Sequence, residues 1–170
     1  MIKFSIIIPV KSLNDYVRET IPYIQALKTF DWELFVVPNS LEDNEWLEDT
    51  RITILDSGPV GPADKRDLAA QKASGEILVF LDDDSYPKSD ILEIANKHFI
   101  SPDVIAVGGP GITPSSDSFW QKVSGAVFLS KYTGGFPERY VSLGVNKEIN
   151  DWPSVNLMVR KEVFLSVGGF

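Results

Sequence analysis

The chain has 170 residues, of which 44% are hydrophobic and 24% are charged, a mixture typical of one globular domain. It contains no cysteine, which excludes disulfide scaffolds, thiolate metal centres and cysteine nucleophiles. Twenty-four acidic against 16 basic residues give a formal charge of −8, which disfavours nucleic acid and anionic membranes as partners.

Dense apolar runs alternate along the chain with stretches of helical spacing. The strands predicted from the apolar runs are 3–10, 33–37, 51–55, 76–81, 104–107 and 154–160. The predicted helices are 12–27, 63–74, 89–99 and 119–131. We expect Ser12 to cap the first helix and Gly75 to end the second. The alternation predicts an α/β domain with a mostly parallel sheet and helices on both faces.

The N-terminal apolar run, 4–10, contains Pro9 and lacks the basic flank of a signal peptide. No stretch approaches the roughly 20 apolar residues that a membrane span needs. We therefore expect a cytoplasmic protein with no membrane span in this chain, and attachment through other segments stays open.

Three polar features follow predicted strands, at the edge where open parallel sheets bind ligands: Lys11, Asn39 and the triplet Asp82–Asp84. Asp82 and Asp84 project to the same side of an extended chain, about 6.6 Å apart. Hard oxygen ligands without histidine or cysteine suit Mg²⁺ or Mn²⁺, completed by water and substrate phosphate. The alternative is a solvated acidic turn that caps the next helix.

A second half-site precedes the triplet. Gly61-Pro62-Ala63 opens a helix whose first turn holds Lys65 and Arg66. A helix N-terminus beside a guanidinium can bind an anion, although a plain solvated first turn would have the same composition. A metal site beside a basic helix start suggests a nucleoside diphosphate as the ligand.

The run GPADKRDLAAQKASGEILVFLDDDSYP (61–87) resembles the donor-site core of family 2 glycosyltransferases of the GT-A fold, where an arginine-bearing helix and a hydrophobic strand lead into a DxD motif. SIIIPV (5–10) is similar to the first strand of that family, and NLMVRKEVFLSVGGF (156–170) to a later strand–helix segment. The resemblance implies a Rossmann-like GT-A sheet, with a nucleotide-sugar-binding half over 1–110 and an incomplete acceptor-side half over 111–170.

The resemblance also implies roles for single residues. Pro9, Val10 and Lys11 would border the base and ribose, Arg66 would approach the base or diphosphate, and Asp82 and Asp83 would hold the ribose or water-mediated metal contacts. Asp84, together with Asp82, would bind Mn²⁺ or Mg²⁺. The family usually places an aspartate after its second strand to hydrogen-bond the base, whereas this chain has Asn39, so uracil selectivity does not carry over. Asp151 and Trp152 are candidates for the acceptor cleft.

The implied reaction moves a sugar with inversion from a nucleotide-diphosphate sugar to a saccharide, lipid-linked or other hydroxyl acceptor, for polysaccharide or glycoconjugate synthesis. The family's general base follows the GGF segment, so we expect the base downstream of Phe170 and the chain to be the N-terminal portion of a longer enzyme. The alternatives are a sugar-nucleotidyltransferase, a HAD-type phosphatase and a non-catalytic nucleotide-sugar-binding module. A sugar-nucleotidyltransferase would have a Gly-rich basic loop after the first strand, and this chain has none there. A HAD-type phosphatase would carry threonine or valine at the position of Tyr86.

Overall fold

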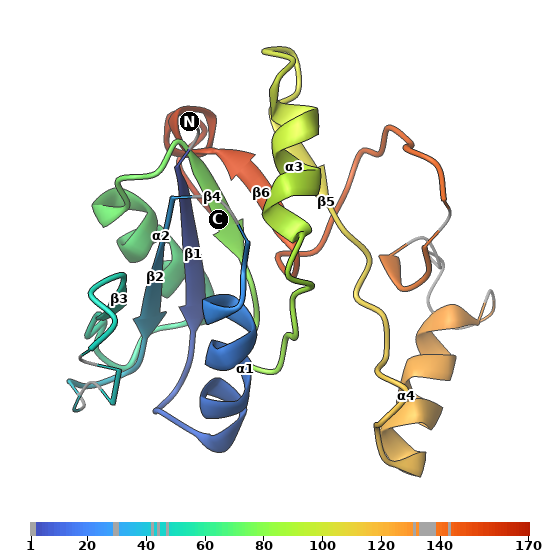
Figure 1. Cartoon of the computed structure of the whole chain (residues 1–170), viewed down its shortest axis with the longest axis horizontal. Helices are drawn as coiled ribbons and strands as arrows, with labels where there is room; N and C mark the ends of the chain where they lie inside the picture. Colours follow the sequence, from blue (N-terminus) through green and yellow to red (C-terminus); the bar gives the residue numbers. More distant parts are fainter. Residues whose placement is uncertain are drawn as a thin grey trace. The chain divides into compact units, whose positions relative to one another are not determined.

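The computed structural model describes residues 3–28, 31–41, 43, 45–46, 48–130, 132, 139–142 and 144–170. Strands and helices alternate along most of this part of the chain (Figure 1). The strands are β1 (Phe4–Pro9), β2 (Trp32–Val37), β3 (Ile52–Ile54), β4 (Ile77–Phe80), β5 (Ala106–Gly108) and β6 (Leu157–Arg160). The helices are α1 (Asp15–Gln25), α2 (Pro62–Lys72), α3 (Ile91–Phe99), α4 (Phe119–Leu129) and α5 (Lys161–Ser166).

The described strands form one sheet in the order β3-β2-β1-β4-β6-β5. β1 lies between β2 and β4 and is parallel to both, while β2 is also parallel to β3. β6 is antiparallel to β4, with Ile77 opposite Arg160. The prediction of a mostly parallel α/β sheet is confirmed, and the carboxyl ends of β1, β2 and β4 meet at one edge.

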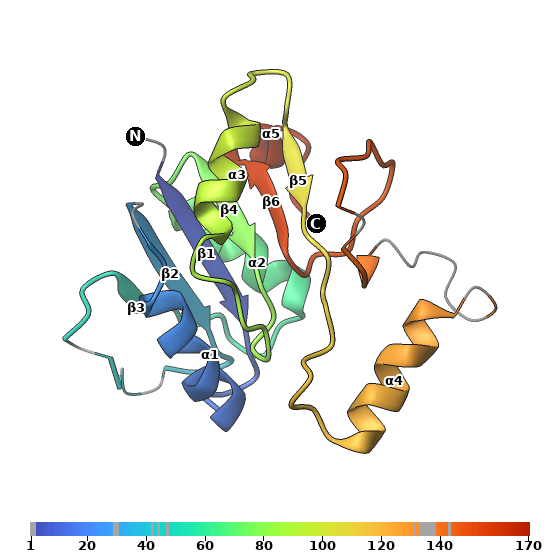
Figure 2. The same ribbon diagram turned by 45° about the vertical axis from the view of Figure 1, so that its right-hand side comes forward.

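The sheet is covered on both faces, which explains why its central strands are continuous apolar runs (Figure 2). Phe4, Ile6 and Ile8 of β1 face a core that α1 and α3 complete. Ile7 faces the opposite way, into a second core formed with alanines of α2 and with Phe164 of α5. Because successive side chains of a strand point to opposite faces, β1 contributes residues to both cores.

The chain divides into two compact units. The first contains the residues up to Val107 together with Leu157–Phe170, and thus nearly all of the sheet. The second is Gly108–Asn156, which holds α4. Ser118 caps α4 by accepting from the Gln121 N–H, and Gln121 Oε1 accepts from the Ser118 N–H at 2.9 Å. No helix in the described ranges is long and apolar enough to cross a membrane.

Two local predictions were wrong. Asn14, not Ser12, caps α1: its Oδ1 accepts from the Val17 N–H at 2.9 Å, because Asn14 is the residue directly before the first helical turn. Gly75 is not a left-handed helix stop, since α2 ends at Lys72. Gly75 instead lies against Ser5, whose Oγ would be 2.5 Å from a Cβ at position 75.

Candidate functional site

The loops after β1, β2 and β4 lie next to one another because their strands are neighbours in the sheet. The backbone N–H of Val10 donates to the Val37 carbonyl, and that of Asn39 donates to the Lys11 carbonyl, both at 3.1 Å. Asp82–Asp84 follow β4 at the same edge. The structure thus brings together the polar residues that the sequence predicts at separate strand ends.

The first turn of α2 adds two cations, and both are buried. Lys65 is 3% exposed and Arg66 is 8% exposed, so the solvated-turn interpretation was wrong. Ala69 and Ala70, one turn later, are buried on the same side of the helix. Their small side chains let α2 pack closely on the sheet, and the two long side chains extend from that face toward the strand ends.

Lys65 connects the ends of β1 and β2. Its ammonium donates to the carbonyl of Val10 and, at 2.5 Å, to Oδ1 of Asn39. Burial lowers the pKa of Lys65, because desolvation penalises the charged form. Lys65 therefore fixes Val10 and Asn39, two residues for which the family resemblance implies a place beside the nucleoside.

Arg66 connects α2 to the acidic triplet. Its Nη2 donates to Oδ1 of Asp82 at 2.8 Å, and its guanidinium carbon lies 5.6 Å from the centre of the Phe170 ring. Burial lowers the pKa of Arg66, and the neighbouring Asp82 carboxylate opposes that shift. The Nε of Arg66 is buried without a hydrogen-bond partner among the described residues, so the guanidinium still has donor capacity toward a ligand.

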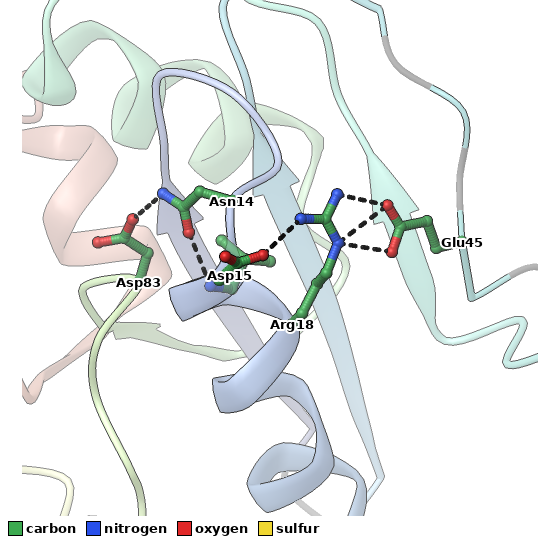
Figure 3. A network of polar contacts seen from close by, with 6 residues as sticks. Asn14, Asp15, Arg18, Glu45 and Asp83 are labelled. Atoms are coloured by element: carbon green, nitrogen blue, oxygen red, sulfur yellow. Dashed lines mark hydrogen bonds and ion pairs between the residues drawn. The ribbon is translucent and has the colours of Figure 1, made fainter.

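Asp83 is held by the cap of α1, Asn14 (Figure 3), and by a residue in the middle of that helix, Thr20. Nδ2 of Asn14 donates to its carboxylate at 2.7 Å, and Oγ1 of Thr20 donates to its backbone carbonyl at 2.6 Å. Beside this contact, Arg18 forms an exposed ion pair with Glu45 at 2.7 Å. The cap and the middle of α1 therefore together orient the turn that carries the acidic triplet.

The sequence of the chain matches the model of Glycosyl transferase family 2 over residues 5–166. The chain belongs to this family. It is 26% identical to the O-antigen biosynthesis protein RfbC of Myxococcus xanthus over 193 aligned positions, which cover 99% of this chain and 14% of that protein.

Solved structures share the fold of this family 2 domain. The mannosyltransferase PcManGT from Pyrobaculum calidifontis, in complex with GDP-Man and Mn²⁺, is 19% identical with a TM-score of 0.65, over 98% of this chain and 47% of that one. S. aureus TarS 1–349, in complex with UDP-GlcNAc, is 21% identical with a TM-score of 0.56, over 68% of this chain and 36% of that one. The expected GT-A fold is confirmed, and the chain spans less than half the length of either structure.

The acidic triplet has donors that fit a hard divalent cation. Asp82 is half-buried and Asp84 is exposed, so carboxylate oxygens border solvent where a phosphate and a cation could meet. Within the described ranges, no group of three or more histidine, cysteine, aspartate or glutamate side chains is arranged to hold a metal ion. The donor set therefore suits Mg²⁺ or Mn²⁺ that takes one or two carboxylates and completes its shell with water and substrate, not an all-protein cage.

The acceptor-side candidates lie in the second unit. Asp151 forms an ion pair with Arg139, with 2.5 Å between Oδ2 and Nη2. Trp152 is half-buried, with its indole against Gly108, where a Cβ would lie 2.4 Å from the ring. The Trp152 Nε1 is buried with no hydrogen-bond partner in the described part of the chain. A role for Asp151 and Trp152 in acceptor binding stays a prediction.

Sequence reasoning missed Asn14 and Thr20 as supports of the site. Both belong to the amphipathic segment around α1, where a capping asparagine and a buried threonine are ordinary features. Only the adjacency of α1 to the turn after β4, more than 60 residues later, gives them a function.

Proposed function

We propose that this family 2 domain binds a nucleotide-diphosphate sugar together with Mn²⁺ or Mg²⁺. The protein transfers the sugar, with inversion, to an acceptor hydroxyl in the synthesis of a polysaccharide or glycoconjugate. The observation that carries the proposal is the convergence of two buried cations, Lys65 and Arg66, with Asp82–Asp84 at the carboxyl edge of a parallel sheet.

The charges support a diphosphate ligand. Arg66 is desolvated and retains a buried, unpaired Nε–H, and charge-assisted hydrogen bonds from a guanidinium to phosphate are among the strong ones. Asp82 accepts from Arg66 through one carboxylate oxygen, and with Asp84 it would hold the cation. The two solved relatives were captured with GDP-Man and Mn²⁺ and with UDP-GlcNAc, and RfbC is described as an O-antigen biosynthesis protein.

In the proposed reaction the residues of this chain bind and orient the donor. Asp82 and Asp84 would hold the cation, which would supply Lewis-acid stabilisation of the leaving diphosphate when bound. Arg66 donates to the diphosphate, and Asn39 with the strand-end residues Pro9, Val10 and Lys11 borders the nucleoside.

The acceptor oxygen attacks the anomeric carbon, the bond to the diphosphate oxygen breaks, and the acceptor proton passes to a general base. We assign none of the described residues as that base.

Calorimetry with UDP, GDP, dTDP and CDP, each with and without Mn²⁺, tests the donor site. We expect at least one nucleotide to bind in a metal-dependent manner and Asp84→Asn to abolish this binding. Asp103→Asn, an exposed carboxylate before β5, is the matched control and should bind like the wild type. A folded sample that binds none of the four nucleotides would overturn the proposal.

Product formation separates an enzyme from a binding module. The full-length protein, supplied with the nucleotide sugar that binds best, should release nucleoside diphosphate in the presence of an acceptor, and Asp84→Asn should not. Binding without turnover across a panel of hydroxyl acceptors would favour the binding module.

A further inference from the structure

Lys65 and the strand ends immobilise the side chain of Asn39. The ammonium of Lys65, 3% exposed, donates to Oδ1 of Asn39 and to the carbonyl of Val10. The backbone N–H of Asn39 donates to the Lys11 carbonyl at 3.1 Å. Asn39 is therefore fixed through both its backbone and its side chain, at the position where the proposed function places the nucleoside.

The contact with Lys65 decides which end of the Asn39 amide is available to a ligand. An amide has an oxygen that accepts and a nitrogen that donates, whereas the nitrogen of Lys65 acts as a donor toward both of its partners. The oxygen must therefore face Lys65, and Nδ2 faces away. In the described part of the chain Nδ2 of Asn39 has no hydrogen-bond partner, and it is not buried away from solvent. The carboxyl edge of the sheet thus offers a hydrogen-bond donor at this point.

We propose that Lys65 is a positioning residue that holds Asn39 as a donor toward N3 of a pyrimidine base, so that the site prefers cytidine over uridine diphosphates. This inference rests on the proposed function. In cytosine N3 is an acceptor, whereas in uracil it carries a hydrogen, so uracil would leave two donors facing each other. Sites that leave a polar group unpaired in this way discriminate strongly between ligands.

Calorimetry with CDP and UDP in the presence of Mn²⁺, on the wild type and two variants, tests the inference. The wild type should bind CDP roughly tenfold more tightly than UDP, the size expected for one unpaired polar contact. Asn39→Asp should reverse the preference, because one carboxylate oxygen keeps the contact with Lys65 and the other accepts from N3–H of uracil. Lys65→Met frees the amide to rotate and should bring the CDP-to-UDP ratio close to one, whereas Lys72→Met, on the exposed side of α2, should leave it unchanged.

The outcomes separate this inference from the proposed function. If none of UDP, CDP, GDP and dTDP binds to the folded wild type, the proposed function fails. If nucleotides bind but UDP equals or exceeds CDP, if only GDP binds, or if Asn39→Asp leaves the ratio unchanged, the function stands and the inference fails. Circular dichroism establishes which variants are folded, and Asn39→Asp decides the matter if Lys65→Met does not fold.

Discussion

Nη2 of Arg66 donates to Oδ1 of Asp82 at 2.8 Å, and this pair joins the first turn of α2 to the acidic triplet after β4. The two partners differ in exposure, because the side chain of Arg66 is 9% exposed and that of Asp82 is 43% exposed. Removing the arginine therefore leaves a carboxylate that water can solvate, instead of a buried, uncompensated charge. The pair is thus better placed to bind a ligand than to hold the fold together.

Arg66→Met should consequently weaken nucleotide binding far more than it lowers stability. A charge-assisted hydrogen bond to phosphate contributes about 1.5–3 kcal/mol, so we expect a loss of roughly tenfold to a hundredfold in the affinity for nucleoside diphosphate. The melting temperature should change little, because methionine fills the same apolar surroundings. Calorimetry and thermal melts measure both quantities, and Lys72→Met is the control on the same helix. Unchanged affinity in a folded Arg66→Met variant would exclude the assigned role.

Asn14 has two separable functions, which two substitutions distinguish. Asn14→Ala removes both the cap of α1 and the contact with Asp83, and should lower the free energy of unfolding by about 1–2 kcal/mol in chemical denaturation. Asn14→Ser keeps a good cap but is too short to reach Asp83. We expect the serine variant to recover most of the stability and to remain weak in metal-dependent nucleotide binding. Recovery of both properties would show that the contact with Asp83 is dispensable.

The sheet could be predicted from the sequence because its central strands are uninterrupted apolar runs, and such runs occur where both faces are covered. Those strands also placed Asn39 and Asp82–Asp84 at one edge, since parallel neighbours end together. The burial of Lys65 could not be predicted in the same way. Its surroundings are set by how closely the alanine face of α2 approaches the sheet, which depends on tertiary packing and not on the composition of the turn.

Contacts between segments that are distant in the sequence could not be predicted from it either. Asn14 meets Asp83 across 69 positions of sequence, and a capping pattern does not reveal which turn packs beside the cap. Gly75 is a second residue whose role depends on a tertiary contact that the sequence does not reveal. A glycine after a helix suggests a left-handed helix end. At position 75, however, glycine is needed because a Cβ would clash with Ser5.

Glu33 should make the stability of the domain depend on pH. Burial alone would raise its pKa, but hydrogen bonds from the Ser5 hydroxyl and from the backbone and hydroxyl of Ser74 outweigh it, with Lys3 assisting, and the pKa lies below its usual value. A carboxylate with a depressed pKa stabilises the folded state above the pKa of the unfolded chain, about 4.3, and that contribution is lost as the pH falls through the folded pKa.

Glu33→Gln should therefore destabilise the domain at pH 7, by about 1 kcal/mol for the weakened hydrogen bonds, and the difference from the wild type should shrink below about pH 4. Urea denaturation at pH 7 and at pH 3.5 measures this change. Glu76→Gln, at an exposed carboxylate next to β4, is the matched control and should shift stability little at either pH. If the difference in unfolding free energy between Glu33→Gln and the wild type were the same at both pH values, the ionisation of Glu33 would not contribute to stability.

Gly75→Ala should be among the most damaging single-methyl additions in the first unit. The new Cβ would lie 2.5 Å from Oγ of Ser5, 2.8 Å from its backbone nitrogen and 2.9 Å from the Lys3 carbonyl, and the two backbone atoms belong to β1 or its first flanking residue. Because Oγ of Ser5 also accepts the Gly75 N–H and donates to Glu33, relief of the clash would break that chain of hydrogen bonds.

We expect a loss of about 1–3 kcal/mol in the free energy of unfolding, the usual cost of overpacking a filled site. Gly111→Ala is the matched control, because a Cβ there has no atom within 4 Å and the glycine is not left-handed. Chemical denaturation of the two variants beside the wild type decides the comparison. Equal stability of Gly75→Ala and Gly111→Ala would show that β1 can move away from position 75 at little cost. The edge of the sheet opposite the proposed donor site would then deform more easily than its hydrogen bonds indicate.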